Sequence, residues 1–130
     1  MNVIILGASG FLGLHLCNFL KVKNTVLRCG RNRKNDIILK NINQKKISKI
    51  LEKYKPDIVI NLIALTNVDL CEKNFEIAKS TNVTGTQNVI DGCKKTSTKL
   101  VYFSTSAVFD GKKIKYSESD ETCPVNNYGI

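Results

Sequence analysis

The fold is decided near the start of the chain, by the stretch NVIILGASGFLG at residues 2–13. Residues 2–6 form a short, continuously apolar run, which is typical of a buried parallel strand. Three glycines then follow in the spacing G-x-x-G-x-x-G, and apolar residues recur at helical spacing over residues 11–20. A strand, a glycine-rich turn and a helix in this order predict a loop that binds the pyrophosphate of a dinucleotide.

The residue types in this loop suit that chemistry. Small residues allow a tight turn and let a phosphate approach the main chain without meeting a Cβ atom. The start of the following helix offers free N–H groups and the positive end of its dipole, and the last glycine lets the helix pack closely. A plain turn is the alternative for an isolated glycine cluster. The predicted phosphate-binding residues are Gly7, Ser9, Gly10, Phe11, Leu12 and Gly13.

Short apolar runs alternate with helical patterns along the rest of the chain. We expect further strands at residues 24–29, 37–39, 57–62 and 100–104, and helices at 44–54 and 75–93. This alternation predicts βαβ units with right-handed crossovers, and therefore a doubly wound parallel sheet of the Rossmann type. We expect residues 1–130 to be one such α/β domain, truncated after about five strands, with a polar, loop-like tail from residue 105.

Composition and cysteine usage exclude several classes of protein. The chain has 130 residues, of which 42% are hydrophobic and 24% charged, as in ordinary globular domains. It has no apolar run of about 18 residues and no secretory signal pattern. Five cysteines without Cys-x-x-Cys spacing and a single histidine, His15, support neither a disulfide framework nor a zinc site. We expect reduced thiols in a cytoplasmic protein, with Cys17 in the core.

Positive charge is concentrated in the first part of the chain. Residues 1–55 hold twelve basic and two acidic residues, whereas residues 56–130 hold eight basic and nine acidic ones, for a net charge of +9. Solvated helix faces, attraction of a polyanionic small molecule and nucleic-acid binding are the three interpretations. Because the basic residues are scattered and no aromatic platforms lie among them, we expect no nucleic-acid partner.

The end of the second predicted strand distinguishes the two nicotinamide dinucleotides. An acidic residue there binds the ribose 2′-hydroxyl of NAD, whereas an arginine accepts the 2′-phosphate of NADP. The sequence reads CGRNR at residues 29–33, with no acid before Asp36. Arg31 stands where the selecting residue is expected, and its guanidinium group suits a phosphate dianion. A solvated turn is the alternative. We therefore predict NADP(H) as the cofactor, with NAD(H) second.

An ordered set of short motifs resembles the extended short-chain dehydrogenase/reductases, and within them most closely the dTDP-4-dehydrorhamnose reductases. Each motif is modest alone, but together they span the whole chain in the order typical of that family. After the glycine loop they are PDIVIN at 56–61, ALTNVD at 64–69 with Glu72, Asn82-Val83, Gly85-Thr86, Ser104-Thr105, VFDG at 108–111, Tyr116 with Glu118, Pro124, and Tyr128-Gly129.

This resemblance implies further cofactor contacts beyond the glycine loop. Residues Ile63, Ala64, Leu65 and Thr66 match the segment that runs alongside the cofactor in the family. Asn41 and Ile42 fall where relatives have an acidic and an aliphatic residue near the adenine, so the asparagine is a departure. Asn82 matches a position whose role in the family is mainly structural.

The resemblance also implies a catalytic pair. Thr105 matches the catalytic serine or threonine, and Tyr128 matches the catalytic tyrosine, which is also counted among the cofactor contacts. Hydride would move from the nicotinamide to a sugar ketone that Thr105 orients, while Tyr128 supplies the proton. The family places a lysine four residues after this tyrosine, beyond Ile130, and Ser106-Ala107 replaces the usual Asp-Tyr near the substrate.

We therefore expect the N-terminal portion of an NADP(H)-dependent reductase of a nucleotide-linked 4-keto-6-deoxy sugar, inactive alone. The substrate-binding region, which relatives build mostly from their C-terminal half, is expected to be absent. The alternatives are a non-catalytic dinucleotide-binding module, such as the β subunit of methionine adenosyltransferase, and a nucleotide-sugar epimerase or dehydratase. The expected partners are the nucleotide sugar and, through an uncovered sheet edge, a second copy of the chain, with no membrane partner.

Overall fold

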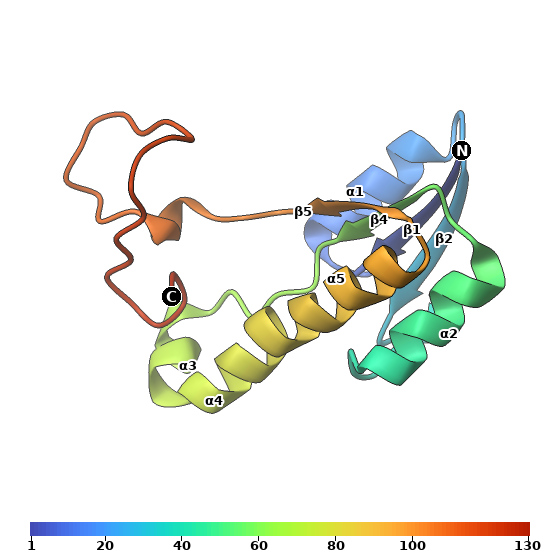
Figure 1. The fold of residues 1–130 in the computed structure, drawn as a ribbon, viewed down its shortest axis with the longest axis horizontal. Coiled ribbons are helices and arrows are strands. Elements are labelled where there is room, and N and C mark those ends of the chain that lie inside the picture. The colour runs from blue at the N-terminus through green and yellow to red at the C-terminus, as the bar shows by residue number, and fades with distance from the viewer.

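Five parallel strands form a single sheet in the order β3-β2-β1-β4-β5 in the computed structural model, which describes all of residues 1–130 (Figure 1). The central strand β1 pairs with β2 on one side and with β4 on the other, so that Leu6 lies opposite both Cys29 and Asn61. The predicted doubly wound parallel fold is confirmed. The strands are β1 (Asn2–Leu6), β2 (Thr25–Gly30), β3 (Ile37–Ile38), β4 (Ile58–Asn61) and β5 (Lys99–Tyr102).

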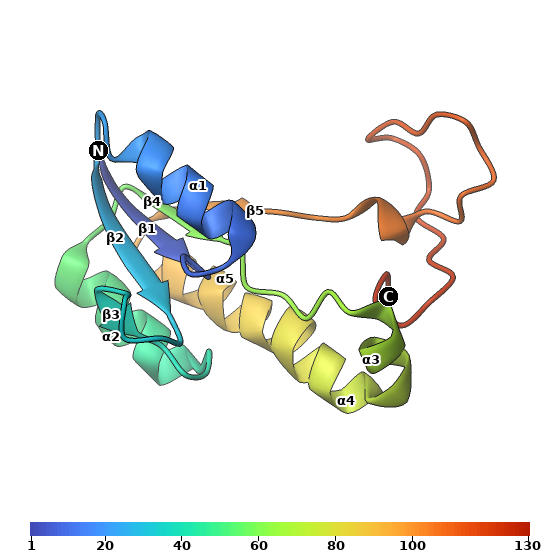
Figure 2. The ribbon, with the colours of Figure 1, turned by 180° about the vertical axis from the view of Figure 1, so that it is seen from behind.

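Helices cover both faces of the sheet. Helix α1 lies on one face, while α2 and α5 lie on the other, as the two opposite views show (Figures 1 and 2). The helical elements are α1 (Phe11–Leu20), α2 (Gln44–Tyr54), α3 (Val68–Lys73), α4 (Phe75–Ala78), the π-helix η1 (Lys79–Thr84), α5 (Gly85–Lys95) and the 3₁₀-helix η2 (Ser106–Val108).

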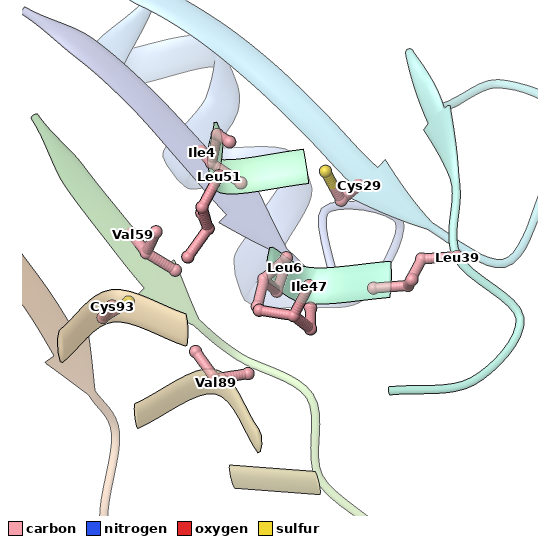
Figure 3. Packing of buried hydrophobic residues seen from close by; sticks show 9 residues of the cluster. All are labelled: Ile4, Leu6, Cys29, Leu39, Ile47, Leu51, Val59, Val89 and Cys93. Atoms are coloured by element: carbon pink, nitrogen blue, oxygen red, sulfur yellow. The ribbon is translucent and has the colours of Figure 1, made fainter. Parts of the chain in front are cut away.

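The alternating side chains of β1 divide the core into two layers. Ile4 and Leu6 face α2 and α5, where Ile47 and Leu51 of α2 complete a buried cluster (Figure 3). Val3 and Ile5 face the other way, toward Cys17 of α1, which is buried as predicted. A strand that is apolar on both faces has to be covered on both, and this is why residues 2–6 indicate a parallel sheet.

Local hydrogen bonds fix where the helices begin and end. Asn43 caps α2, since its side chain accepts from the Lys46 amide at 2.9 Å. At the other end, Lys55 takes a left-handed conformation with φ 41°, and Pro56 follows. A left-handed residue with a proline beyond it is a common helix stop. The predicted helix at 44–54 therefore has the predicted bounds.

The helix expected at 75–93 is present and runs without a break from Phe75 to Lys95, but its middle is a π-helix: α4, η1 and α5 follow one another directly. The six-residue helix α3 comes before them, where no helix was predicted. Asn67 caps α3 by accepting from the Leu70 amide at 2.8 Å. Periodicity does not distinguish a π-turn from an α-turn within one apolar pattern, and α3 is too short for periodicity to detect.

The last segment of the chain leaves the sheet. After β5, residues 104–130 extend away from the strands and return only at the C-terminus, which ends beside α3 (Figures 1 and 2). Apart from η2 this tail has no regular element, as predicted. Its own structure depends on Asp110, which accepts from the Tyr116 hydroxyl at 2.5 Å, and on the stacked rings of Phe109 and Tyr116. No helix in the structure has the length and apolar character needed to span a membrane.

Candidate functional site

A cavity of about 470 Å³ lies at the carboxyl ends of the strands. Its lining comes from the loop after β1, the ends of β2 and β4, residues 39–42 after β3, and the helical region around η1. The strand order reverses between β1 and β4, and open parallel sheets bind ligands in the crevice beside such a reversal. The cavity therefore occupies the position that the topology favours for a ligand.

The glycine loop forms one wall of this cavity and leaves no room for side chains. Gly7 has φ +83°, and a Cβ atom there would lie 3.1 Å from the Leu62 carbonyl carbon. A Cβ atom on Gly13 would lie 2.8 Å from the Cα atom of Ala8 and would overlap the Gly7 carbonyl oxygen. The amides of Gly7 and Ala8 both donate to the Cys29 carbonyl, at 2.9 and 3.1 Å. The loop is therefore bound to the ends of β2 and β4 at once.

The predicted loop residues divide into two groups. Gly7, Ser9 and Gly10 line the cavity. The side chains of Phe11 and Leu12 are 84% and 42% exposed and do not line it, and Gly13 is buried beneath the loop. Gly10 directly precedes helix α1, and no side chain caps the helix start. A helix start in this state can hold an anion through its N–H groups.

The charged side chains that line the cavity, Arg31 and Lys40, are both cations. Arg31 directly follows β2, at the position where the sequence predicts the residue that selects between NAD and NADP. Lys40 was not predicted, although its position directly after a predicted strand end was visible in the sequence. Two unneutralised cations favour a ligand that carries several negative charges.

Asp36, the first acid after β2, is bound elsewhere. Its carboxylate accepts from the Arg28 guanidinium at 2.8 Å and from the Arg28 amide at 2.8 Å. The hydrogen bonds from Arg28 lower the pKa of Asp36 to about 2. Asp36 does not line the cavity, so no carboxylate opposes Arg31 there.

The segment after β3 is held in place by helix α5. Asn41 and Ile42 line the cavity, and the Asn88 side chain donates to the Ile42 carbonyl at 3.1 Å. A Cβ atom on Gly85 would lie 3.3 Å from the Ile42 side chain, so the glycine allows this close approach. The Asn41 oxygen accepts from the Lys46 ammonium at 2.9 Å, which shows that the asparagine is engaged with α2.

Two asparagines shape the wall after β4. Asn61 is 1% exposed and accepts from the Ile63 amide at 3.2 Å, while its side-chain nitrogen has no partner. Asn82, in η1, accepts from the Leu65 amide at 2.7 Å and donates to the Leu65 carbonyl at 3.0 Å. Ile63, Ala64 and Leu65 line the cavity and Thr66 does not. The paired bonds of Asn82 agree with the structural role that the resemblance implies.

The π-helix η1 also contributes side chains that the sequence did not reveal. Ser80 and Thr81 line the cavity from η1, next to Ile77 of α4. Such π-turns are rare and occur often at functional sites. Two hydroxyl groups in an exposed helical segment carry no sequence pattern that would have identified them.

The predicted catalytic pair lies outside the cavity lining, in the tail. Thr105 caps η2, and its hydroxyl oxygen accepts from the Ala107 amide at 3.2 Å. A Cβ atom on Gly129 would overlap the Ala107 carbonyl oxygen. The turn that carries Tyr128 therefore packs against the segment that Thr105 starts, and the fold brings the two residues into one region.

No thiol in the site is poised for nucleophilic chemistry. All five cysteines are free, and four of them are buried. Burial raises the pKa of Cys29, at the end of β2, to about 12, and that of Cys93 to about 11. These thiols stay protonated at neutral pH, and a protonated thiol is a weak nucleophile. No group of three or more potential metal ligands is present.

The parallel sheet, its glycine loop and the cavity beside the strand-order reversal together define a nucleotide-binding α/β fold of the Rossmann type. The whole chain, residues 1–130, matches the family described as the RmlD substrate binding domain, and it belongs to this family. The resemblance to the extended short-chain dehydrogenase/reductases is thereby confirmed.

Relatives of known name agree with this assignment. The chain is 35% identical to the dTDP-4-dehydrorhamnose reductase of Burkholderia thailandensis over 99% of its own length and 42% of that protein. It is 29% identical to the methionine adenosyltransferase 2 subunit beta of Danio rerio, over 98% of its length and 40% of that protein. The chain thus spans less than half the length of these curated relatives.

Solved structures share the fold. A hypothetical dTDP-4-dehydrorhamnose reductase from Sulfolobus tokodaii superposes with a TM-score of 0.92 at 32% identity, over 99% of this chain and 48% of that one. The dTDP-4-dehydrorhamnose reductase of Bacillus anthracis, solved in complex with NADP, gives 0.90 at 32% identity, over 98% and 45%. A UDP-glucose 4-epimerase from Brucella ovis, in complex with NAD, gives 0.89 at 25%, over 98% and 43%.

The Asp36–Arg28 pair makes stability depend on pH in acid. Because the folded state lowers the pKa of Asp36 from 3.8 to about 2, its contribution is complete above pH 3.8 and is lost as the pH falls toward 2. We expect Asp36→Asn to cost about 1 kcal/mol of unfolding free energy at neutral pH, since the pair is partly exposed to solvent. Urea unfolding should show this difference shrinking in acid, whereas Glu118→Gln should give none. A difference independent of pH would contradict the assignment.

Proposed function

We propose that residues 1–130 form the NADP(H)-binding domain of a reductase that acts on the ketone of a nucleotide-linked 4-keto-6-deoxy sugar. The observation that carries the proposal is the cavity at the strand-order reversal, with the glycine loop on one side and two cations on its rim. We place the protein in the cytoplasm, where free thiols such as its five cysteines remain reduced.

The glycine loop suits the pyrophosphate of the cofactor. Gly7, Ser9 and Gly10 line the cavity, and the uncapped start of α1 adds the positive end of the helix dipole. The segment at residues 63–65 offers an apolar wall on the other side, with Leu65 held by Asn82. These residues would bind the cofactor and exclude water from one side of it.

The charge distribution favours NADP(H) over NAD(H). Arg31 and Lys40 line the cavity, and the nearest candidate for a ribose-binding carboxylate, Asp36, is paired with Arg28. A 2′-phosphate offers two negative charges to these cations, whereas a 2′-hydroxyl leaves them without a partner. The relative from Bacillus anthracis that was solved with NADP supports the same choice.

The chemistry on the sugar follows from the catalytic pair. When bound, the reduced nicotinamide supplies a hydride for the carbonyl carbon. Thr105 would orient the ketone by a hydrogen bond to its oxygen, and the Tyr128 phenol would give its proton to the same oxygen as the alcohol forms. The names of the relatives support a dTDP-linked 4-keto sugar. Ser106 and Ala107 stand where the family usually has Asp-Tyr beside the substrate.

A second candidate is a regulatory module that binds the dinucleotide without turnover. The similarity to a β subunit of methionine adenosyltransferase favours it. The two proposals share the cofactor site and differ only in whether Tyr128 transfers a proton, so turnover decides between them.

Removing the Arg31 guanidinium should change cofactor preference rather than abolish binding. We expect Arg31→Ala to raise the dissociation constant for NADPH at least about tenfold, and that for NADH less than about threefold, because a charge-assisted contact to the 2′-phosphate is lost. Calorimetric titration of both cofactors measures the two values, and Arg33→Ala, two residues along the same turn, is the matched control. Equal losses for NADPH and NADH would show that Arg31 does not contact the 2′-phosphate.

The reductase proposal requires the phenol of Tyr128. In the full-length natural protein we expect Tyr128→Phe to lower the turnover of dTDP-4-keto-6-deoxy sugar at least about 100-fold while NADPH binding changes little, since general acid catalysis is lost. NADPH oxidation followed at saturating cofactor measures it, with Tyr54→Phe, an exposed tyrosine at the end of α2, as the control. Tight NADPH binding without turnover in the wild-type protein would favour the regulatory module instead.

A further inference from the structure

A single side chain connects the tail to the body of the molecule by hydrogen bonds. Residues 104–130 make many hydrogen bonds among themselves, but the two that reach outside this segment both go to Glu72 of α3. In the ribbon the tail swings away from the sheet after β5, and only its last turn returns, beside α3 (Figures 1 and 2). The polar attachment of the tail therefore depends on one carboxylate.

Both oxygens of this carboxylate are used. Oε1 of Glu72 accepts from the Asn127 amide at 2.7 Å, and Oε2 accepts from the Asn127 side-chain nitrogen at 2.9 Å. Glu72 and Asn127 are separated by 55 residues in the sequence. A bidentate contact to a charged acceptor fixes both position and orientation, and it is stronger than a contact between neutral groups.

The anchored residue belongs to a closed turn. The Gly129 amide donates to the Asn126 side-chain oxygen at 2.9 Å, and the Ile130 amide donates to the Asn126 carbonyl at 3.2 Å. Tyr128 sits in the middle of this turn and is half-buried. Holding Asn127 therefore also holds the backbone that carries the Tyr128 ring.

On the other side, Glu72 stands on a helix that is fixed to the cavity wall. Asn67 caps α3, and the buried Cys71 directs its thiol toward the Leu65 carbonyl at 3.6 Å. Leu65 lines the cavity and is held in turn by Asn82. A continuous set of contacts thus runs from the cavity wall through α3 to the turn at residues 126–130.

We propose that Glu72 is a positioning residue for Tyr128. Its carboxylate holds the turn at residues 126–130 against α3 and thereby fixes the position of the Tyr128 phenol relative to the cavity wall at Leu65. This inference rests on the proposed function for the role of Tyr128, but the anchor itself does not depend on cofactor binding. Without the Glu72 carboxylate, no hydrogen bond would join residues 104–130 to the rest of the chain and hold this turn in place.

The donor and acceptor pattern of the contact permits a swap that tests it. In Glu72→Gln the side chain can still accept from the Asn127 amide, and the Asn127 side chain can turn its oxygen toward the new NH₂ group, so both contacts persist only between neutral groups and are weaker. Adding Asn127→Asp places a carboxylate opposite that NH₂ group, so the double variant regains a charge-assisted contact. A loss of fold or a general charge effect of Glu72 would not be rescued in this way.

Amide hydrogen exchange by NMR in the 130-residue chain measures the anchor. We expect Glu72→Gln to speed exchange at the residue 127 amide at least about tenfold, the E72Q/N127D double variant to restore it, and amides of β1 to stay unchanged. Glu76→Gln, on the neighbouring helix α4, should have no effect. Unchanged exchange at residue 127 in Glu72→Gln, or loss without rescue in the double variant, would overturn the proposal.

Turnover then tests positioning as distinct from attachment. In the full-length natural protein, Glu72→Gln should lower kcat about tenfold with the KM for NADPH unchanged, and the double variant should recover kcat. Loss of the anchor without a change in kcat would overturn the positioning role. If the wild-type protein bound no NADPH, the proposed function would fail, and the exchange data would still decide whether Glu72 holds the turn.

Discussion

The site depends on the close approach between the first helix and the loop that precedes it. Helix α1 comes so near the Gly7 carbonyl that a methyl group on Gly13 would overlap it, and Gly7 itself has the positive φ that only glycine adopts without strain. This approach lets two loop amides share the Cys29 carbonyl, which ties the loop to β2 while Gly7 lies against Leu62 after β4. The main-chain atoms of the loop and the start of α1 are thereby presented to one side of the cavity. A side chain at either glycine would displace the helix start and with it the wall.

Electrostatics adds to this geometry without altering the fold. The glycine loop offers N–H dipoles and no full charge, so the formal charges at the cavity are those of Arg31 and Lys40. The ion pair between Asp36 and Arg28 contributes to this charge distribution. It holds the Asp36 carboxylate against Arg28 of β2, so that this carboxylate does not neutralise the cations at the cavity. The basic excess in residues 1–55 thus lies partly at the cavity, on Arg31 and Lys40, and partly on the exposed surface of α2.

Much of this arrangement was predictable from the sequence, and the rest depends on contacts between distant residues. Local sequence patterns predict the strand at 2–6, the glycine loop after it and the helix at 44–54, because each of these elements depends on residues close together in the chain. The structure has the strand and the helix with the predicted bounds. The short helix α3 and the π-helix η1 have no hydrophobic periodicity of their own by which the sequence could identify them. Asn82 and Glu72 belong to the motifs that carry the family resemblance, but their partners lie 17 and 55 residues away, and no local pattern in the sequence reveals those contacts. Lys40 was not predicted for a different reason. It lines the cavity because of the path that the chain takes after β3, and the sequence does not show that path.

The central claim is that the cavity beside the strand-order reversal holds NADP(H), and chemical-shift mapping tests it most directly. When NADPH is added to the ¹⁵N-labelled chain, amides of residues 7–10, Arg31 and residues 63–65 should shift together and saturate at one dissociation constant. Amides on the solvated face of α2, where basic residues are also frequent, should stay in place. Shifts spread over α2 and the other basic surfaces, without saturation at the glycine loop, would mean that the chain attracts the phosphates only through its net charge, and the account of the site would be wrong.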